Sequence, residues 1–570
     1  MQYDLDRIDD CFPKAEFREG QKKAIEFACK QFNEGKKVVI LECPTGSGKS
    51  AIGMTMANMA ENSYYLTITK ILQDQFMNDF GDKVVELKGR NAYPCDYYER
   101  NREKLAKIIP IDKLDEKIEE KPDCASGYCK SKIGRKDGHK CSGCFLRDQI
   151  PGVPKGDLNR LPDGKSYSAC AYYEQVFKSV NNPVVCMNFN SFIYQTMMTR
   201  RFDMPRDLLI IDEGHNIEQV LLDVVSFVFA SDTFKDFGII LPKYEDPRDY
   251  FDWCKEERIA EVIALAIEDA KRKEDHKTED DLSKLVKRVI QFLETFEQSE
   301  WVCQTTYAER SKEFSVEFKP VFIRDYADKM LFRFADKVLI MSATILDINV
   351  FCNALGLEKD QIASYRMKNR FPVENRPIYF KDCGNLTGGK GRMNEWMPKV
   401  IDVVDEICER YPDERGMIHT HNFAILDALV DGCQNRHRFI TQRMHPDKKE
   451  LLELHARKPG SILVAPAMHE GVDLNGDLSR FQIISKVPFP NFFDNKQLNR
   501  RNQVDPAYIP WLTALKLVQS YGRSIRGPED YADTYIIDGS FVGFIKRSGR
   551  LFPSWFMDAL QDGDKESCPF

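Results

Sequence analysis

Short runs of apolar residues recur along the chain and alternate with helical stretches. Continuous runs of four or five apolar residues are typical of strands that are buried on both faces of a parallel sheet. The pattern therefore predicts an α/β protein with parallel sheets. The predicted strands lie at 38–41, 208–211, 337–340, 461–465 and 481–485.

One segment, 217–320, has a different pattern. It contains long charged stretches, for example at 268–273. Leu282, Leu285, Ile290 and Leu293 follow one another at helical spacing. We expect this segment to be an inserted helical domain.

Length and charge limit the domain organisation and the partners that fit this sequence. A chain of 570 residues is too long for one core, which predicts several domains. The formal net charge is −7, so any contact with nucleic acid would need a local basic groove. The chain has no run of eighteen apolar residues and begins with an acidic stretch, so we expect a cytoplasmic protein without a membrane segment.

A glycine-rich turn follows the first predicted strand. Gly46 and Gly48 allow the backbone N–H groups to point at phosphates, and Lys49 adds a positive charge. Ser50 is placed to bind Mg²⁺ through its hydroxyl. Cys43 replaces the usual first glycine of the motif, but the part that touches phosphate is intact. The predicted ATP-binding residues of the loop are Pro44, Thr45, Gly46, Ser47, Gly48, Lys49 and Ser50.

Two carboxylates follow the second predicted strand. Asp212 is placed to bind Mg²⁺, and Glu213 to orient and deprotonate the water that attacks the γ-phosphate. An acidic loop that caps a helix is the alternative for any such pair. The glycine-rich turn earlier in the chain makes ATP hydrolysis the better interpretation.

Six of the seventeen cysteines crowd into a segment that has little apolar periodicity. Such a segment cannot bury enough surface to fold alone, so a metal or a cluster would hold it together. Four thiolates suit either zinc or iron–sulfur, and spacing alone does not decide between them. The six are Cys95, Cys124, Cys129, Cys141, Cys144 and Cys170.

Ordered motifs along nearly the whole chain resemble the XPD/DinG iron–sulfur helicases of superfamily 2, of the DEAH type. Each motif is short, but together they occur in the order of that family. They lie at 17–21, 42–50, 67–75, 87–91, 170–173, 212–215, 341–344, 416–420, 470–474, 488–490 and 519–526.

The resemblance implies two RecA-like motor domains with two insertions. It also implies that the metal group is a [4Fe–4S] cluster. The expected order is motor domain 1 at 1–94, an iron–sulfur cluster domain at 95–170, motor domain 1 again at 171–216, a helical arch-like domain at 217–320, the end of motor domain 1 at 321–350, and motor domain 2 at 351–570.

The resemblance also assigns single residues. Gln21 would read adenine, and Asp473 and Gln519 would join the nucleotide site. Arg523 and Arg526 would reach the γ-phosphate as arginine fingers.

Further roles of this kind concern DNA and the cluster. Thr69 would contact DNA, and His215 would couple the ATP and DNA sites. Flanking motifs identify Cys95 and Cys170 as cluster ligands, although Ala171 replaces a proline. The middle pair is left open between Cys124 with Cys129 and Cys141 with Cys144, and the two spare cysteines could bind a second metal.

The expected function is an ATP-dependent DNA helicase, a monomer that moves 5′ to 3′ on single-stranded DNA and opens forked DNA. An ATP-driven translocase that displaces proteins without separating strands is the alternative. A non-catalytic DNA-binding module is disfavoured by the intact motor motifs. The natural substrate, such as a replication fork or a DNA-repair bubble, is left open.

Overall fold

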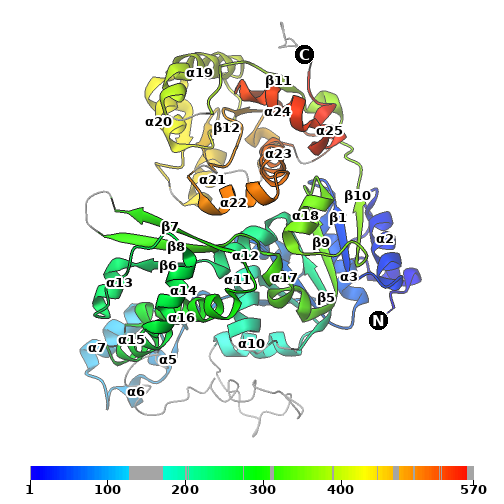
Figure 1. The fold of residues 1–570 in the computed structure, drawn as a ribbon. Helices are drawn as coiled ribbons and strands as arrows, with labels where there is room; N and C mark the ends of the chain where they lie inside the picture. Colours follow the sequence, from blue (N-terminus) through cyan, green and yellow to red (C-terminus); the bar gives the residue numbers. More distant parts are fainter. Residues whose placement is uncertain are drawn as a thin grey trace.

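Two parallel sheets, each covered by helices, form the main lobes of the computed structural model (Figure 1). The structure describes residues 2–127, 171–198, 202, 204–273, 275–308, 313–387, 390–445, 447–466, 474, 476–491, 494–525, 527 and 529–561. Six predicted site residues lie outside these ranges, namely Cys129, Cys141, Cys144, Cys170, Asp473 and Arg526.

The first lobe contains a seven-stranded parallel sheet within the described residues. Its strands, in spatial order, are β10 (Ile362–Arg366), β1 (Val38–Glu42), β9 (Ala335–Ser342), β5 (Arg206–Ile211), β2 (Ser63–Thr67), β4 (Val184–Asn188) and β3 (Val85–Leu87). Its helices include α1 (Ile8–Cys11), α2 (Gln21–Asn33), α3 (Lys49–Met59), α4 (Lys70–Phe80), α10 (Ala171–Asn181), α11 (Phe189–Ile193), α17 (Arg324–Met330) and α18 (Ile348–Leu355).

The first sheet extends beyond the expected end of motor domain 1. Strand β10 pairs with β1 in parallel, from Val38 opposite Ile362 to Glu42 opposite Arg366. The boundary expected at residue 350 therefore lies too early, and we place it after Arg366. The weak apolar pattern of β10, which is an edge strand with no fully buried residue, explains the difference.

The second lobe contains a six-stranded sheet within the described residues, and all its pairs are parallel. The strands, in spatial order, are β11 (Ile378–Phe380), β16 (Asp533–Ile536), β15 (Phe481–Ile484), β12 (Gly416–His419), β14 (Ile462–Ala465) and β13 (Phe439–Thr441). Its helices include α19 (Lys390–Arg410), α20 (Phe423–Gly432), α21 (Lys448–Arg457), α22 (Lys496–Val504), α23 (Tyr508–Tyr521), α24 (Ser540–Ser548) and α25 (Ser554–Met557).

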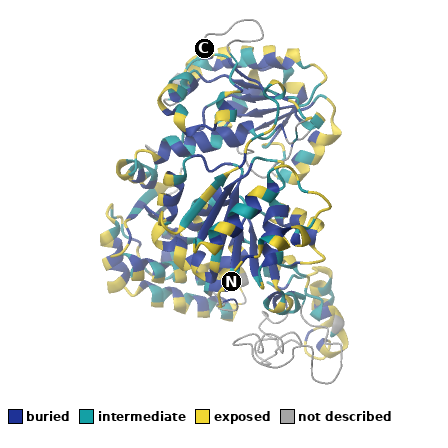
Figure 2. Cartoon of the chain, turned by 90° about the vertical axis from the view of Figure 1, so that its right-hand side faces the viewer, coloured by how far each residue is buried: buried dark blue, intermediate teal, exposed yellow. Residues whose placement is uncertain are grey.

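The predicted parallel sheets are confirmed, because all five predicted strands are present as β1, β5, β9, β14 and β15. Figure 2 shows the strands of both sheets as buried, with exposed residues on the outer faces of the helices. Continuous burial of both strand faces is what the unbroken apolar runs require.

The segment between β5 and β9 is not purely helical. It contains the predicted helices, with α16 (His276–Thr295) covering the apolar spacing, and also a three-stranded antiparallel sheet in the order β6, β8, β7. Strand β8 alternates buried and half-buried residues, a period-2 signal that the charged stretches around it obscured. The segment comprises α12 (Ile217–Val225), β6 (Phe227–Ala230), α13 (Ser231–Asp236), α14 (Pro247–Glu256), α15 (Ile259–Lys273), α16, β7 (Trp301–Tyr307) and β8 (Phe314–Pro320).

The two lobes contact each other directly. The indole of Trp511 on α23 donates to the carbonyl of Ile345 at 2.9 Å. Arg501 on α22 is fully buried and lies 3.4 Å from Glu218 on α12. The two lobes therefore enclose a cleft, with the loops after β1, β5 and β9 of the first sheet on one wall. None of the helices described is long and apolar enough to cross a membrane.

Candidate nucleotide site between the two sheets

The glycine-rich turn lies between the end of β1 and the start of α3. Gly46 and Gly48 have φ values of +76° and +79°, a region that favours glycine. Lys49 is the first residue of α3, so the turn presents its backbone N–H groups and the helix N-terminus to the cleft. That arrangement is an anion site suited to nucleotide phosphates.

The side chain of Gln21 bonds to the backbone of this turn. Its Nε2 donates to the carbonyl of Ser47 at 2.9 Å and lies 3.2 Å from that of Gly48. Its Oε1 accepts from the backbone N–H of Arg18 at 2.7 Å. Gly48 has a φ of +79° and a Cβ there would lie 2.4 Å from Nε2, so a larger residue would strain the turn and displace the Gln21 amide. The sequence did not reveal this contact, and adenine recognition by Gln21 stays a prediction.

Asp212 and Glu213 follow β5 and face the same turn. Lys49 Nζ lies 3.8 Å from Glu213 Oε1. Glu213 has a φ of +52°, an unusual backbone conformation for a residue with a side chain. Burial raises the pKa of Asp212 to about 6, and the charge of Glu213 acts in the same direction. The structure thus brings the predicted lysine and acids together.

Asp212 and Ser50 fit a magnesium ion. The hydroxyl of Tyr65 lies 3.5 Å from Asp212 Oδ2 and also interacts with the Ser50 side chain. The two side chains are therefore close neighbours. A carboxylate and a hydroxyl are oxygen ligands of the kind that Mg²⁺ prefers.

His215 connects these acids to the Met341–Thr344 motif. Its Nδ1 lies 2.8 Å from Ser342 Oγ and 3.5 Å from Glu213 Oε2. Ser342 Oγ also donates to the carbonyl of Thr344 at 3.1 Å. The contact gives a physical path between two motifs that are more than a hundred residues apart.

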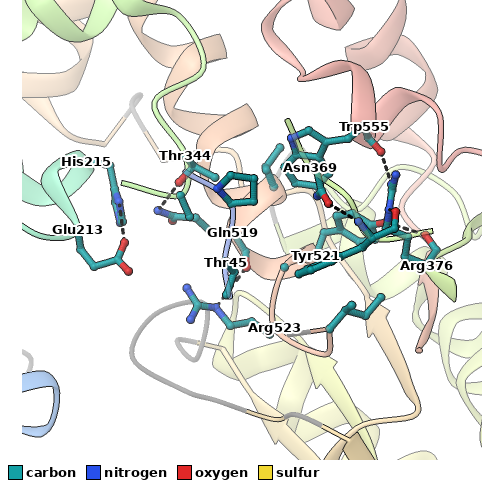
Figure 3. A pocket seen from close by; sticks show the side chains of 16 residues that line it. Thr45, Glu213, His215, Thr344, Asn369, Arg376, Gln519, Tyr521, Arg523 and Trp555 are labelled. Atoms are coloured by element: carbon teal, nitrogen blue, oxygen red, sulfur yellow. Dashed lines mark hydrogen bonds and ion pairs between the residues drawn. The ribbon is translucent and has the colours of Figure 1, made fainter. Parts of the chain in front are cut away.

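The second lobe forms the opposite wall of the cleft. Gln519 Nε2 lies 3.4 Å from Thr344 Oγ1, and Arg523 lines the same cavity (Figure 3). The cavity and its mouth, which opens to solvent, hold about 650 Å³. Its lining residues are Pro44, Thr45, Glu213, His215, Ala343, Thr344, Asn369, Phe371, Arg376, Val518, Gln519, Tyr521, Gly522, Arg523, Ile525 and Trp555.

Several of these lining residues were not predicted. Asn369, Phe371 and Arg376 come from the linker between the sheets, and Trp555 comes from α25. They belong to no recognisable motif, so only the fold brings them to the predicted residues.

Two residues of the 67–75 motif have structural partners. Thr69 Oγ1 accepts from the backbone N–H of Leu72 at 3.2 Å and so caps α4. Gln73 is fully buried, and its Nε2 lies 3.4 Å from the carbonyl of Cys186. Gln73 therefore stabilises the sheet, whereas contact of Thr69 with DNA stays a prediction.

Cys95 and Cys124 lie on two neighbouring segments. An antiparallel bridge joins Pro94 to Asp123, so the segments that carry the two cysteines run side by side. A Cβ at Gly127 would lie 2.5 Å from Cys95 Sγ, so the turn after Cys124 wraps closely around this sulfur. Soft thiolate donors in such a cradle fit an iron–sulfur cluster, which Cys residues outside the described ranges would complete.

Three family models match the sequence. They are a helicase C-terminal domain at residues 404–559, the type III restriction enzyme res subunit at 14–137, and DEAD_2 at 149–234.

Two curated relatives cover different shares of the chain. The ATP-dependent DNA helicase YoaA of Haemophilus influenzae is 22% identical and covers 91% of this chain and 90% of its own length. The ATP-dependent DNA helicase DinG of Photobacterium profundum is 22% identical over 42% of this chain and 36% of its own length.

Solved structures share the fold. An XPD helicase superposes with a TM-score of 0.60 at 13% identity, covering 94% of this chain and 99% of the other. S. tokodaii Xpd4 superposes with a TM-score of 0.53 at 12% identity, covering 95% and 99%.

Proposed function

Because this chain is an XPD/DinG-like helicase of superfamily 2, we propose that it hydrolyses Mg-ATP to move 5′ to 3′ on single-stranded DNA and to separate duplex DNA. The observation that carries this proposal is the composite cleft. Lys49 and Glu213 lie together on one wall, while Gln519 and Arg523 line the other.

Each wall has its own task in ATP hydrolysis. The turn before α3 and Lys49 hold the phosphates. Glu213 takes the proton of the attacking water, and its ion pair with Lys49 keeps it in the cleft. Mg²⁺ held by Ser50 and Asp212 would neutralise charge on the β- and γ-phosphates.

The second lobe completes the site. Arg523 and Arg526 stabilise the charge that develops on the γ-phosphate, and Asp473 joins the nucleotide contacts. Gln519 bonds to Thr344 on the first lobe, so nucleotide binding and lobe closure are linked. Closure of the cleft when ATP binds, and its opening after hydrolysis, would advance the protein along one DNA strand.

The protein contacts mainly the phosphate backbone of the DNA. A protein with a net charge of −7 needs a local basic groove for this, and we assign Thr69, at the start of α4, to that groove. The arrangement of His215, Ser342 and Thr344 is suited to relaying the state of the nucleotide to the second lobe.

A [4Fe–4S] cluster would be held by Cys95, Cys124 and cysteines outside the described residues. It would supply folding stability to the segment 95–170, which has few apolar residues of its own. This segment and the one between β5 and β9 would flank the DNA and split the duplex. We propose further that the protein acts as a cytoplasmic monomer.

Phosphate release measured with and without single-stranded DNA tests the proposal. Hydrolysis of ATP should increase several-fold on addition of an oligonucleotide. The absence of ATP turnover, or turnover that ignores DNA, would contradict it.

A further inference from the structure

The last residue of α23 is bonded to the linker between the two sheets. This linker comprises residues 367–377, between β10 and β11. The hydroxyl of Tyr521 donates to the backbone carbonyl of Arg376 at 2.6 Å, and both side chains are buried. Arg523 follows two residues later, so the bond fixes the chain at the base of the candidate arginine finger.

Two further hydrogen bonds of the Arg376 side chain hold this end of the linker in place. Its Nε donates to the carbonyl of Phe371 at 3.0 Å, and its Nη1 donates to the carbonyl of Trp555. The ring of Tyr521 stacks on Trp555, with centroids 5.9 Å apart and planes 19° apart. The linker end, α23 and α25 therefore form one packed unit beside the cavity (Figure 3).

The other end of the linker reaches the phosphate-binding turn. Arg370 forms an ion pair with Glu19. The neighbouring Arg18 donates to the carbonyl of Gly46 within the turn at 2.5 Å. Asn369 of the linker lines the cavity. The linker thus spans the site from the phosphate-binding turn to α23.

We propose that Tyr521 is a positioning residue for Arg523. This inference rests on the proposed function, in which Arg523 meets the γ-phosphate. When the lobes move, the Tyr521–Arg376 bond makes the end of α23 move together with the linker, so Arg523 returns to one place in every cycle. Rate depends steeply on such placement, because a shift of about 1 Å can cost on the order of a hundredfold.

Tyr521→Phe tests this role in the full-length protein, since it removes the hydroxyl and keeps the stacked ring. The matched control is Tyr535→Phe in the same lobe. Tyr535 is fully buried on β16, and its hydroxyl bonds that of Tyr411 at 2.9 Å, away from the cavity. The measurements are kcat and KM for ATP with single-stranded DNA present, and the melting temperature of each variant.

Tyr521→Phe should lower kcat about fivefold or more, which corresponds to the loss of one hydrogen bond, and should leave KM within about twofold. Tyr535→Phe should leave both constants unchanged. Two outcomes would overturn the positioning role while ATP turnover stands. One is equal kcat values for the two variants, and the other is a loss of activity in Tyr521→Phe that comes only from a higher KM. Unmodified protein without ATP turnover would contradict the proposed function itself, and this role with it.

Discussion

Lys49 Nζ and Glu213 Oε1 lie 3.8 Å apart, although β9 separates the two strands that precede them. The lysine is 11% exposed and the glutamate 28%, so the pair is partly shielded from solvent. Without nucleotide the two side chains neutralise each other. We propose that with nucleotide bound the lysine would pair with phosphate and the carboxylate would be left to act on water.

Lys49→Ala should lower ATP turnover at least about a hundredfold, because a cation aimed at the phosphates is lost. Binding of single-stranded DNA should persist, since Lys49 faces the cleft between the lobes. Phosphate release and fluorescence anisotropy with a labelled oligonucleotide measure the two properties. Lys37→Ala is the control, because Lys37 pairs with Asp328 at the other end of β1. Equal turnover in both variants would refute the phosphate site.

Glu213→Gln should lower kcat by about a hundredfold or more, the usual contribution of a general base, with little change in KM for ATP. The amide keeps the shape of the side chain but cannot accept the proton. Steady-state kinetics give both constants, with the surface variant Glu297→Gln for comparison. A rise in KM alone would mean that Glu213 only helps to bind ATP.

Asp212 should make stability depend on pH in metal-free buffer without ATP. Burial raises its pKa from 3.8 to about 6, so between these values the folded protein binds more protons than the unfolded chain. The free energy of unfolding should therefore fall as the pH rises from about 4 to 6, and stay level above.

Asp212→Asn should remove this loss, which is on the order of 1–3 kcal/mol, and should melt higher than the unmodified protein at pH 7 but not at pH 4. Thermal melts across this range check it. Asp79→Asn, at an exposed ion pair with Lys14, is the control. Parallel curves for Asp212→Asn and unmodified protein would show that Asp212 does not carry the effect.

Cys124→Ser should lose iron, because we propose Cys124 as a cluster ligand and an antiparallel bridge places its segment beside that of Cys95. Iron content and visible absorbance of anaerobically purified protein measure this. Cys352→Ser changes a buried cysteine of α18 and should keep full iron. If Cys144→Ser lost iron and Cys124→Ser did not, the middle ligands would be Cys141 and Cys144.

The sequence predicted the framework of the motor well. Unbroken apolar runs are typical of strands buried on both faces, and β1, β5, β9, β14 and β15 were found in this way. The edge strand β10 and the antiparallel β8 were missed, because half-buried strands carry weaker signals among charged neighbours. Unbroken apolar runs therefore identified only part of the two parallel sheets, and the interior strands β2, β4 and β16 were not predicted.

The candidate site was predictable only where a motif carries the chemistry. Lys49, Asp212 and Glu213 were expected to meet and do so. The contact of Gln21 with the turn was not predictable, because it depends on how α2 packs. The part of the cavity wall made by Arg376 and Trp555 was not predictable either. These two residues lie 179 positions apart in the sequence, and Arg376 donates a hydrogen bond to the carbonyl of Trp555.

Strand separation on tailed duplexes tests the central claim most directly. Anaerobically purified protein would be given ATP and a duplex with either a 5′ or a 3′ single-stranded tail, and release of the labelled strand would be followed. We predict unwinding of the 5′-tailed duplex alone, and none by Lys49→Ala. Failure to unwind either duplex while single-stranded DNA still stimulates ATP hydrolysis would contradict the helicase and favour a translocase.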